Sequence, residues 1–116
     1  DNESLRAVKI ASRKEGKGNS VTTKVRDLKN FPLTSNELAK YDAIIVDPPR
    51  SGAKIQFSNI AKSNVKTIIS ISCNINTFIR DSKILIGSNY ELKWVQPIDQ
   101  FLFSAHVELV AIFQLK

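Results

Sequence analysis

Helix-type and strand-type periodicities alternate along this chain, and the alternation indicates an α/β domain with a largely parallel sheet and helices on both faces. Apolar residues at helical spacing predict helices at residues 3–14, 35–39, 54–62 and 76–86. Apolar and β-branched runs predict strands at residues 20–26, 41–47, 65–72, 90–98 and 107–115. No long helix separates the last two strands, so we expect them to pair antiparallel.

Proline and glycine mark where these elements stop. Pro48 and Pro49 cannot continue a strand ladder, so the chain must turn there. Gly87 suits the residue that follows a helix. The order begins with a helix, and none of the four glycines forms a Gly-x-Gly-x-x-Gly turn. We therefore interpret the chain as one domain that is the later part of a larger fold.

Composition narrows the class of protein. No run of about 18 apolar residues occurs, so we expect no membrane span, and the first residues do not resemble a signal peptide. The lone cysteine cannot form an internal disulfide, which suits a cytoplasmic location. The net charge is +6, and eight of the 17 Lys and Arg residues lie within residues 1–29. This bias favours a nucleic-acid partner, although a solvated basic helix face would have the same composition.

Candidate chemical groups gather at the predicted ends of strands. Asp27, Asp47 and Cys73 each end a strand, and ligands of open α/β sheets bind at the carboxyl ends of the strands. His106 and Glu108 lie in the loop that enters the last strand. Each residue also has a structural interpretation: Cys73 as a packing residue and the others as turn or surface groups. One histidine and one cysteine do not make a zinc pattern, so we expect no metal.

Three motifs occur in a recognisable order. They are Asp47-Pro-Pro-Arg-Ser-Gly52, Ser72-Cys-Asn74 continuing through Asn76, Thr77, Arg80 and Asp81, and His106-Val-Glu108. Together they resemble the RNA (uracil-5-)-methyltransferases, which act on tRNA and 23S rRNA with S-adenosylmethionine. The resemblance covers residues 1–116 as the C-terminal portion of the catalytic domain. It implies the later half of a Rossmann-like class I methyltransferase fold, with a mostly parallel sheet and an antiparallel strand near the C-terminus.

The resemblance also implies roles for single residues. Cys73 would be the nucleophile that adds to C6 of uracil, and Glu108 the base that removes the C5 proton. The residues implied to bind the cofactor S-adenosylmethionine are Asp47, Asp27 and Asp1, and those implied to contact the RNA substrate are Arg50, Pro48 and His106. Two departures stand out: Ile75 replaces the proline usual after Ser-Cys-Asn, and the loop at 101–105 differs from the usual Phe-Pro-His-Thr.

Two other classes of function remain open at this point. The chain could be an inert RNA-binding or degenerate remnant, because the glycine-rich cofactor loop and any separate RNA-binding domain are absent from these residues. For the same reason we expect the 116 residues alone to be inactive. The second class is a different methyl transfer, to N6 of adenine or to C5 of cytosine. RNA cytosine-5 enzymes typically carry a cysteine in the loop where this chain has Arg50, which argues against them.

Overall fold

The computed structural model describes residues 2–17, 20–99, 103 and 107–116. The chain divides into two compact units, Asp1–Phe31 and Pro32–Lys116, which we call the first and the second unit. Because the arrangement of the two units is not determined, each is described by itself.

The first unit contains the predicted N-terminal helix but not the predicted strand. Helix α1 spans Asn2–Lys14 and buries none of its residues. An acid in its first turn and two basic residues in its last turn complement the helix dipole. Residues 21–26 lie in no strand, so the strand predicted at 20–26 is wrong. An alternating segment becomes a strand only when its backbone pairs with another strand, and the described residues give it no such partner.

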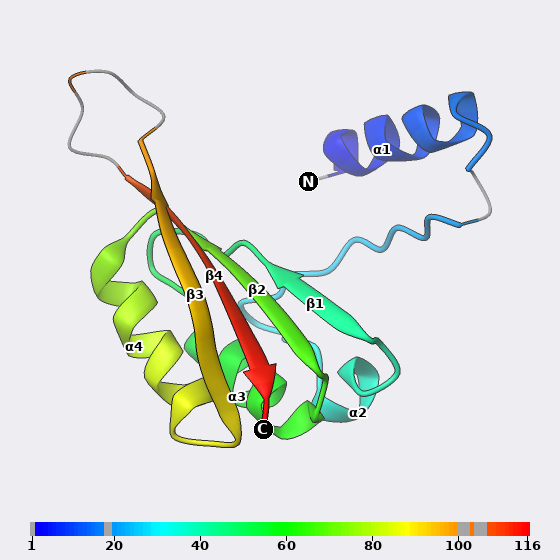
Figure 1. The fold of residues 1–116 in the computed structure, drawn as a ribbon. Helices are drawn as coiled ribbons and strands as arrows, with labels where there is room; N and C mark the ends of the chain where they lie inside the picture. The colour runs from blue at the N-terminus through cyan, green and yellow to red at the C-terminus, as the bar shows by residue number, and fades with distance from the viewer. Residues whose placement is uncertain (1, 18–19, 100–102, 104–106) are drawn as a thin grey trace. The chain divides into compact units, whose positions relative to one another are not determined.

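The second unit is built on a four-stranded sheet with the order β1-β2-β4-β3 (Figure 1). Its strands are β1 (Ala43–Val46), β2 (Thr67–Ser72), β3 (Tyr90–Ile98) and β4 (Glu108–Leu115). Strand β1 pairs parallel with β2, and β4 pairs antiparallel with both β2 and β3. Strands β1, β2 and β3 therefore run in one direction and β4 in the opposite one. The sheet is therefore mixed, with one parallel and two antiparallel pairings, and the predicted antiparallel strand near the C-terminus is confirmed.

Helices cover one face of this sheet. They are α2 (Ser35–Leu38), α3 (Lys54–Ser63) and α4 (Ile75–Ile86), and α3 packs against both α2 and α4 (Figure 1). Within the described part of the second unit no helix lies on the other face, so the prediction of helices on both faces is not met there. Burial in β2 alternates accordingly: Ile68 is fully buried and Ile69 only partly so. On the open face of β1, Ile45 is 68% exposed.

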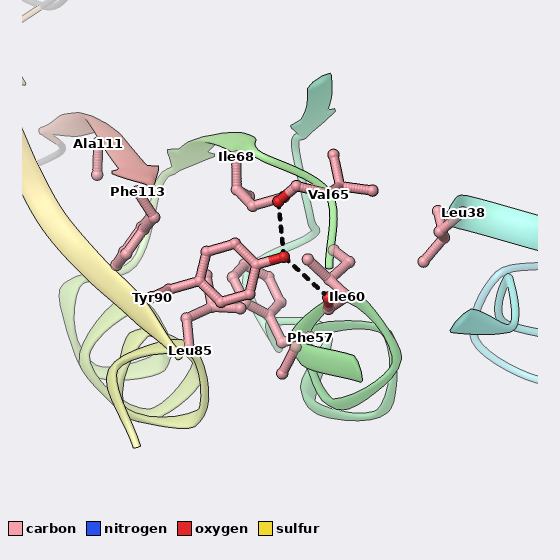
Figure 2. Packing of buried hydrophobic residues seen from close by; sticks show 10 residues of the cluster. Leu38, Phe57, Ile60, Val65, Ile68, Leu85, Tyr90, Ala111 and Phe113 are labelled. Carbon is pink, nitrogen blue, oxygen red and sulfur yellow. Dashed lines mark hydrogen bonds between the residues drawn. The ribbon is translucent and has the colours of Figure 1, made fainter. Parts of the chain in front are cut away.

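The hydrophobic core lies between the sheet and α3 and α4 (Figure 2). Tyr90 at the start of β3 is fully buried, and its hydroxyl donates a 2.7 Å hydrogen bond to the carbonyl oxygen of Val65. Burial raises the pKa of Tyr90 above its usual value of 10.0, because the charged phenolate would lose its hydration. The core therefore joins the first residue of β3 to the segment that enters β2.

Helix α4 ends differently from the prediction. Gly87 is the C-cap itself, with φ −71° and ψ −9°, and not a left-handed residue beyond the cap. Its N–H donates a 2.8 Å hydrogen bond to the carbonyl oxygen of Lys83, which continues the helical pattern by one residue. Glycine is thus not required here for its access to positive φ.

Candidate active site

Cys73 lies at the junction between a strand and a helix. Strand β2 ends at Ser72, and Asn74 is the N-cap of α4. The Asn74 side-chain oxygen accepts hydrogen bonds from the N–H groups of Asn76 (2.9 Å) and Thr77 (3.4 Å), which satisfies two donors of the first helical turn. The Cys73 residue is partly buried. The sequence-based placement of Cys73 at a strand end and a helix start is therefore confirmed.

Strand register brings Glu108 to the same edge of the sheet. The last paired residues of β2 and β4 are Ser72 and Leu109, and Cys73 follows the first of them in the chain while Glu108 precedes the second. A thiol and a carboxylate that are distant in the sequence therefore lie at the same edge of the sheet.

The predicted Asp47 loop lies at this edge as well. Strand β1 runs parallel to β2 with Val46 opposite Ser70, so Asp47 follows at the carboxyl ends of both strands. Asp47 and Arg50 are exposed, whereas Pro48 is partly buried. The structure therefore brings Asp47, the Pro48–Arg50 segment, Cys73 and Glu108 to one edge, and their roles there stay predictions.

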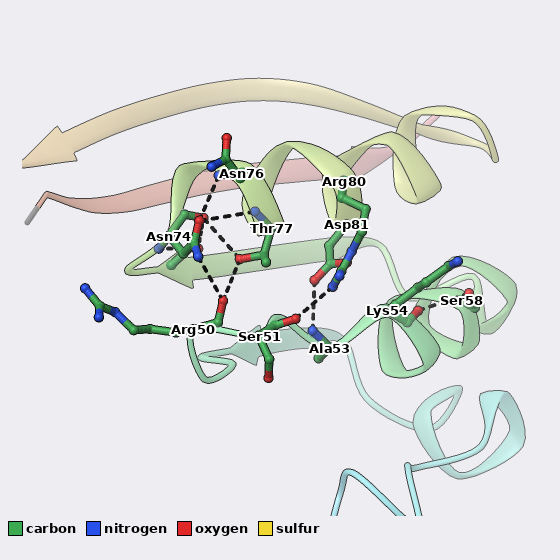
Figure 3. Close-up of polar contacts among 11 residues, drawn as sticks. Arg50, Ser51, Ala53, Lys54, Ser58, Asn74, Asn76, Thr77, Arg80 and Asp81 are labelled. Carbon is green, nitrogen blue, oxygen red and sulfur yellow. Dashed lines mark hydrogen bonds and ion pairs between the residues drawn. The ribbon is translucent and has the colours of Figure 1, made fainter.

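The Asp47 loop is bonded to the first turns of α4 (Figure 3). The carbonyl oxygen of Arg50 accepts hydrogen bonds from Asn74 Nδ2 (3.1 Å) and Thr77 Oγ1 (3.1 Å). Arg80 Nη2 donates to the carbonyl oxygen of Ser51 at 3.0 Å. These α4 residues belong to a motif that is visible in the sequence, but the family resemblance implied no role for them. The available signal was their spacing, because positions 74, 77 and 81 share one face of a helix.

Asp27 belongs to the first unit and caps its own turn. Its carboxylate accepts hydrogen bonds from the N–H of Lys29 (3.1 Å), the N–H of Asn30 (3.2 Å) and the Asn30 side-chain amide (2.6 Å). These bonds, the Asn30 amide foremost, lower the pKa of Asp27 below its usual value. Its predicted contact with a cofactor stays a prediction. Asp1 and His106 lie outside the described residues.

Metal-ligand clusters and membrane helices are both missing from the described residues. No group of three or more His, Cys, Asp or Glu side chains in that part of the chain could hold a metal ion. No described helix has the length and apolar character that a membrane crossing requires.

A solved structure shares this fold. The tRNA (uracil-54, C5)-methyltransferase of Pyrococcus abyssi, crystallised with S-adenosyl-L-homocysteine, superposes with a TM-score of 0.68 at 30% sequence identity. The match covers 88% of this chain and 24% of that one. The fold is accordingly that of part of a methyltransferase.

Sequence comparison identifies the family. Residues 3–115 match the family described as tRNA (Uracil-5-)-methyltransferase. An uncharacterised RNA methyltransferase of Agrobacterium fabrum is 42% identical over 114 residues, which are 98% of this chain and 27% of the relative. The 23S rRNA (uracil(1939)-C(5))-methyltransferase RlmD of Pseudomonas entomophila is 39% identical over 74 residues, 64% of this chain and 16% of the relative. The chain belongs to the tRNA (uracil-5-)-methyltransferase family, and it spans about a quarter of the length of the first curated relatives that it matches.

Proposed function

We propose that these residues form the C-terminal portion of a catalytic domain that methylates C5 of uridine in RNA. The observation that supports the proposal is the pairing of β2 with β4, which ends at Ser72 and Leu109 and so leaves Cys73 and Glu108 at one edge of the sheet. Family membership supports the substrate class, since the named relatives methylate uracil in tRNA or 23S rRNA. Arg50 at the same edge suits a phosphate of that RNA.

In this proposal Cys73 is the nucleophile and Glu108 is the general base. The Cys73 thiolate forms a bond to C6 of uracil, and the electron pair of the C5–C6 double bond makes C5 nucleophilic. Bound S-adenosylmethionine supplies the methyl group that C5 takes up. Glu108 then accepts the C5 proton, the double bond re-forms and the bond from Cys73 to C6 breaks. The thiolate is thereby regenerated, and one proton has passed to Glu108.

Asp47 is the residue of this edge that we assign to the cofactor. Among the described residues, the Asp47 side chain forms no hydrogen bond or ion pair, and it is exposed where α/β sheets bind ligands. A carboxylate at this place suits the hydroxyl and amine groups of S-adenosylmethionine. Asp47 would hold the cofactor, and Pro48 would line the pocket of the target base. The target base has to leave its stack to reach Cys73, as in other enzymes that modify bases.

Covalent trapping tests the proposal in a full-length enzyme that carries these 116 residues. 5-Fluorouridine RNA has no C5 proton to remove, so the adduct with the wild-type enzyme should persist on a denaturing gel. Cys73→Ala should abolish it. Glu108→Gln should accumulate an adduct even with ordinary uridine RNA, because proton removal is blocked. An adduct that survives in Cys73→Ala would overturn the assignment of the nucleophile.

The inert-remnant hypothesis has its own outcome. If the full-length wild-type enzyme binds RNA yet forms no adduct and transfers no methyl group, the degenerate-remnant interpretation holds. Methyl transfer that continues in Cys73→Ala would favour a chemistry that needs no cysteine, such as adenine-N6 methylation. The 116 residues tested alone should neither form the adduct nor bind S-adenosylmethionine at micromolar concentration.

A further inference from the structure

We propose that Asn74, Thr77, Arg80 and Asp81 act as a clamp that positions the loop 50–53 against Cys73. This inference rests on the proposed function, and it concerns positioning residues that act through the loop backbone. The four side chains lie on the first turns of α4, directly after Cys73 in the chain (Figure 3).

The clamp holds three backbone groups of the loop. Two donors, Asn74 Nδ2 and Thr77 Oγ1, converge on the carbonyl oxygen of Arg50, each at 3.1 Å. Arg80 Nη2 holds the carbonyl oxygen of Ser51 at 3.0 Å. The N–H of Ala53 donates to Asp81 Oδ2 at 2.8 Å. The loop backbone is thus held by side chains that lie 24 to 29 residues away in the sequence, and not by the backbone hydrogen bonds of a strand pair.

Asp81 anchors the clamp in the core. Its residue is only 2% exposed, and a buried carboxylate needs partners for both oxygens. Oδ1 receives Arg80 Nε and Nη2, both at 2.9 Å, while Oδ2 receives the N–H of Ala53. The Arg80 side chain is 43% exposed, so its far end reaches the loop from the surface. The ion pair therefore orients Arg80 toward Ser51.

Close approach at Gly52 is a second, independent sign that the loop is seated on α4. Gly52 has φ +74°, a conformation that favours glycine. A Cβ atom at this position would clash with the Arg80 and Asp81 side chains and lie 3.0 Å from Thr77 Cβ. The turn is closed by the Gly52 N–H, which donates to the carbonyl oxygen of Pro49 at 2.8 Å. The loop backbone is thus in direct contact with the clamp.

The consequence for the site is a fixed relation between two parts of it. Cys73 precedes the clamp residue Asn74, and Arg50 carries the carbonyl oxygen that Asn74 and Thr77 hold. In Figure 3 the Arg50 side chain extends away from α4. The clamp therefore holds the backbone of Arg50 and does not hold its guanidinium group. The clamp therefore sets where Arg50 lies relative to a base that is bonded to Cys73. Small displacements at such sites reduce rates strongly.

Thr77 provides the sharpest test, in a full-length enzyme that carries these residues. Thr77→Val keeps the shape and removes the hydroxyl donor, while Thr77→Ser restores the donor. The matched control is Ser58→Ala, which removes a hydroxyl-to-carbonyl bond of 3.1 Å confined to α3. The readouts are the single-turnover rate of adduct formation with 5-fluorouridine RNA, and hydrogen exchange of the amides in residues 50–53.

Thr77→Val should slow adduct formation about tenfold or more and speed exchange of the loop amides several-fold. Thr77→Ser should return both toward wild type, and Ser58→Ala should leave both unchanged. The inference is overturned if Thr77→Val behaves like Ser58→Ala, if exchange rises while the rate does not fall, or if Thr77→Ser fails to restore the rate. If the wild-type enzyme itself forms no adduct, the proposed function fails. The inference about the clamp is judged only by how the variants differ from the wild type.

Discussion

Buried hydroxyl groups in the second unit differ in how well they are satisfied. Ser63 Oγ donates to the carbonyl oxygen of Ile60 at 2.7 Å, and Tyr90 bonds to Val65. Ser82 Oγ in α4 is also buried but has no hydrogen-bond partner in the described structure. An unsatisfied buried hydroxyl costs about 1–3 kcal/mol, whereas a satisfied one contributes about 1 kcal/mol. Of the two buried serines, the Ser63 hydroxyl is therefore expected to stabilise the fold and the Ser82 hydroxyl to destabilise it.

Ser82→Ala should raise the free energy of unfolding by about 1 kcal/mol, because it removes a polar atom that is buried without a partner in the described part of the chain. Ser63→Ala is the matched control and should lower stability by about 1 kcal/mol or more, since it breaks the bond to Ile60. Urea unfolding of both variants measures the difference. Equal destabilisation by the two substitutions would contradict the prediction.

Tyr90 makes stability depend on alkaline pH. Burial raises its pKa in the folded state above the usual 10.0, so the folded chain keeps a proton that the unfolded chain releases. The contribution is fully present below about pH 10 and is lost as the pH rises through the folded-state pKa. Unfolding at several pH values from about 9 to 11 should show a steeper loss for the wild type than for Tyr90→Phe. Parallel curves would show that Tyr90 is not the source.

At the scale of elements, local patterns predicted most of the second unit. Strands β1 to β4 and helices α2 to α4 occur where the periodicity places them, and each contributes residues to the same core, although β3 does so only through Tyr90. The segment 20–26 has the pattern of a strand and lacks the pairing, and pairing is not a local property. The contacts of the clamp could not be predicted from local patterns either, since Arg50 and Thr77 are far apart in the sequence. Motif order pointed to both ends of the clamp without showing that they touch.

Gly52 joins two elements at close range, and this predicts a specific cost. Gly52→Ala adds a clash with Arg80 and Asp81 to the penalty of a left-handed backbone. Gly16→Ala is the matched control: φ is +70°, and nothing among the described residues lies within 4 Å of the added Cβ. We expect about 1–2 kcal/mol for Gly16→Ala and a larger loss for Gly52→Ala, measured by urea unfolding. Equal losses would mean that the loop moves aside without cost.

At the scale of the whole molecule, basic charge is concentrated in the first unit. Eight of the 17 Lys and Arg residues lie within residues 1–29 of a chain with net charge +6. Arg6, Lys9 and Arg13 recur at helical spacing on one side of α1 and are exposed. This arrangement suits the regularly spaced phosphates of RNA. In the sequence, charge favours a nucleic-acid partner but does not distinguish it from a solvated basic helix face.

Neutralising this side of α1 should weaken RNA binding in a salt-dependent way. In a full-length enzyme, replacing Arg6, Lys9 and Arg13 together by glutamine should reduce the slope of log K against log salt by about 2, since each phosphate contact contributes about 0.7 for single strands. Lys93→Gln is the control, because Lys93 is already paired with Glu91 at 2.9 Å. An unchanged slope in the triple variant would place the RNA elsewhere.

The sheet order has one more consequence, which concerns how the sheet can grow. Strands β1 and β3 are its outer members, and they differ in character. Strand β3 carries Pro97 and the Glu91–Lys93 ion pair, features that discourage another chain from adding to an edge. Strand β1 is Ala-Ile-Ile-Val, and its outer backbone groups face no strand among the described residues. A strand added to this sheet, from another polypeptide segment or a second copy, should therefore pair with β1 and not with β3.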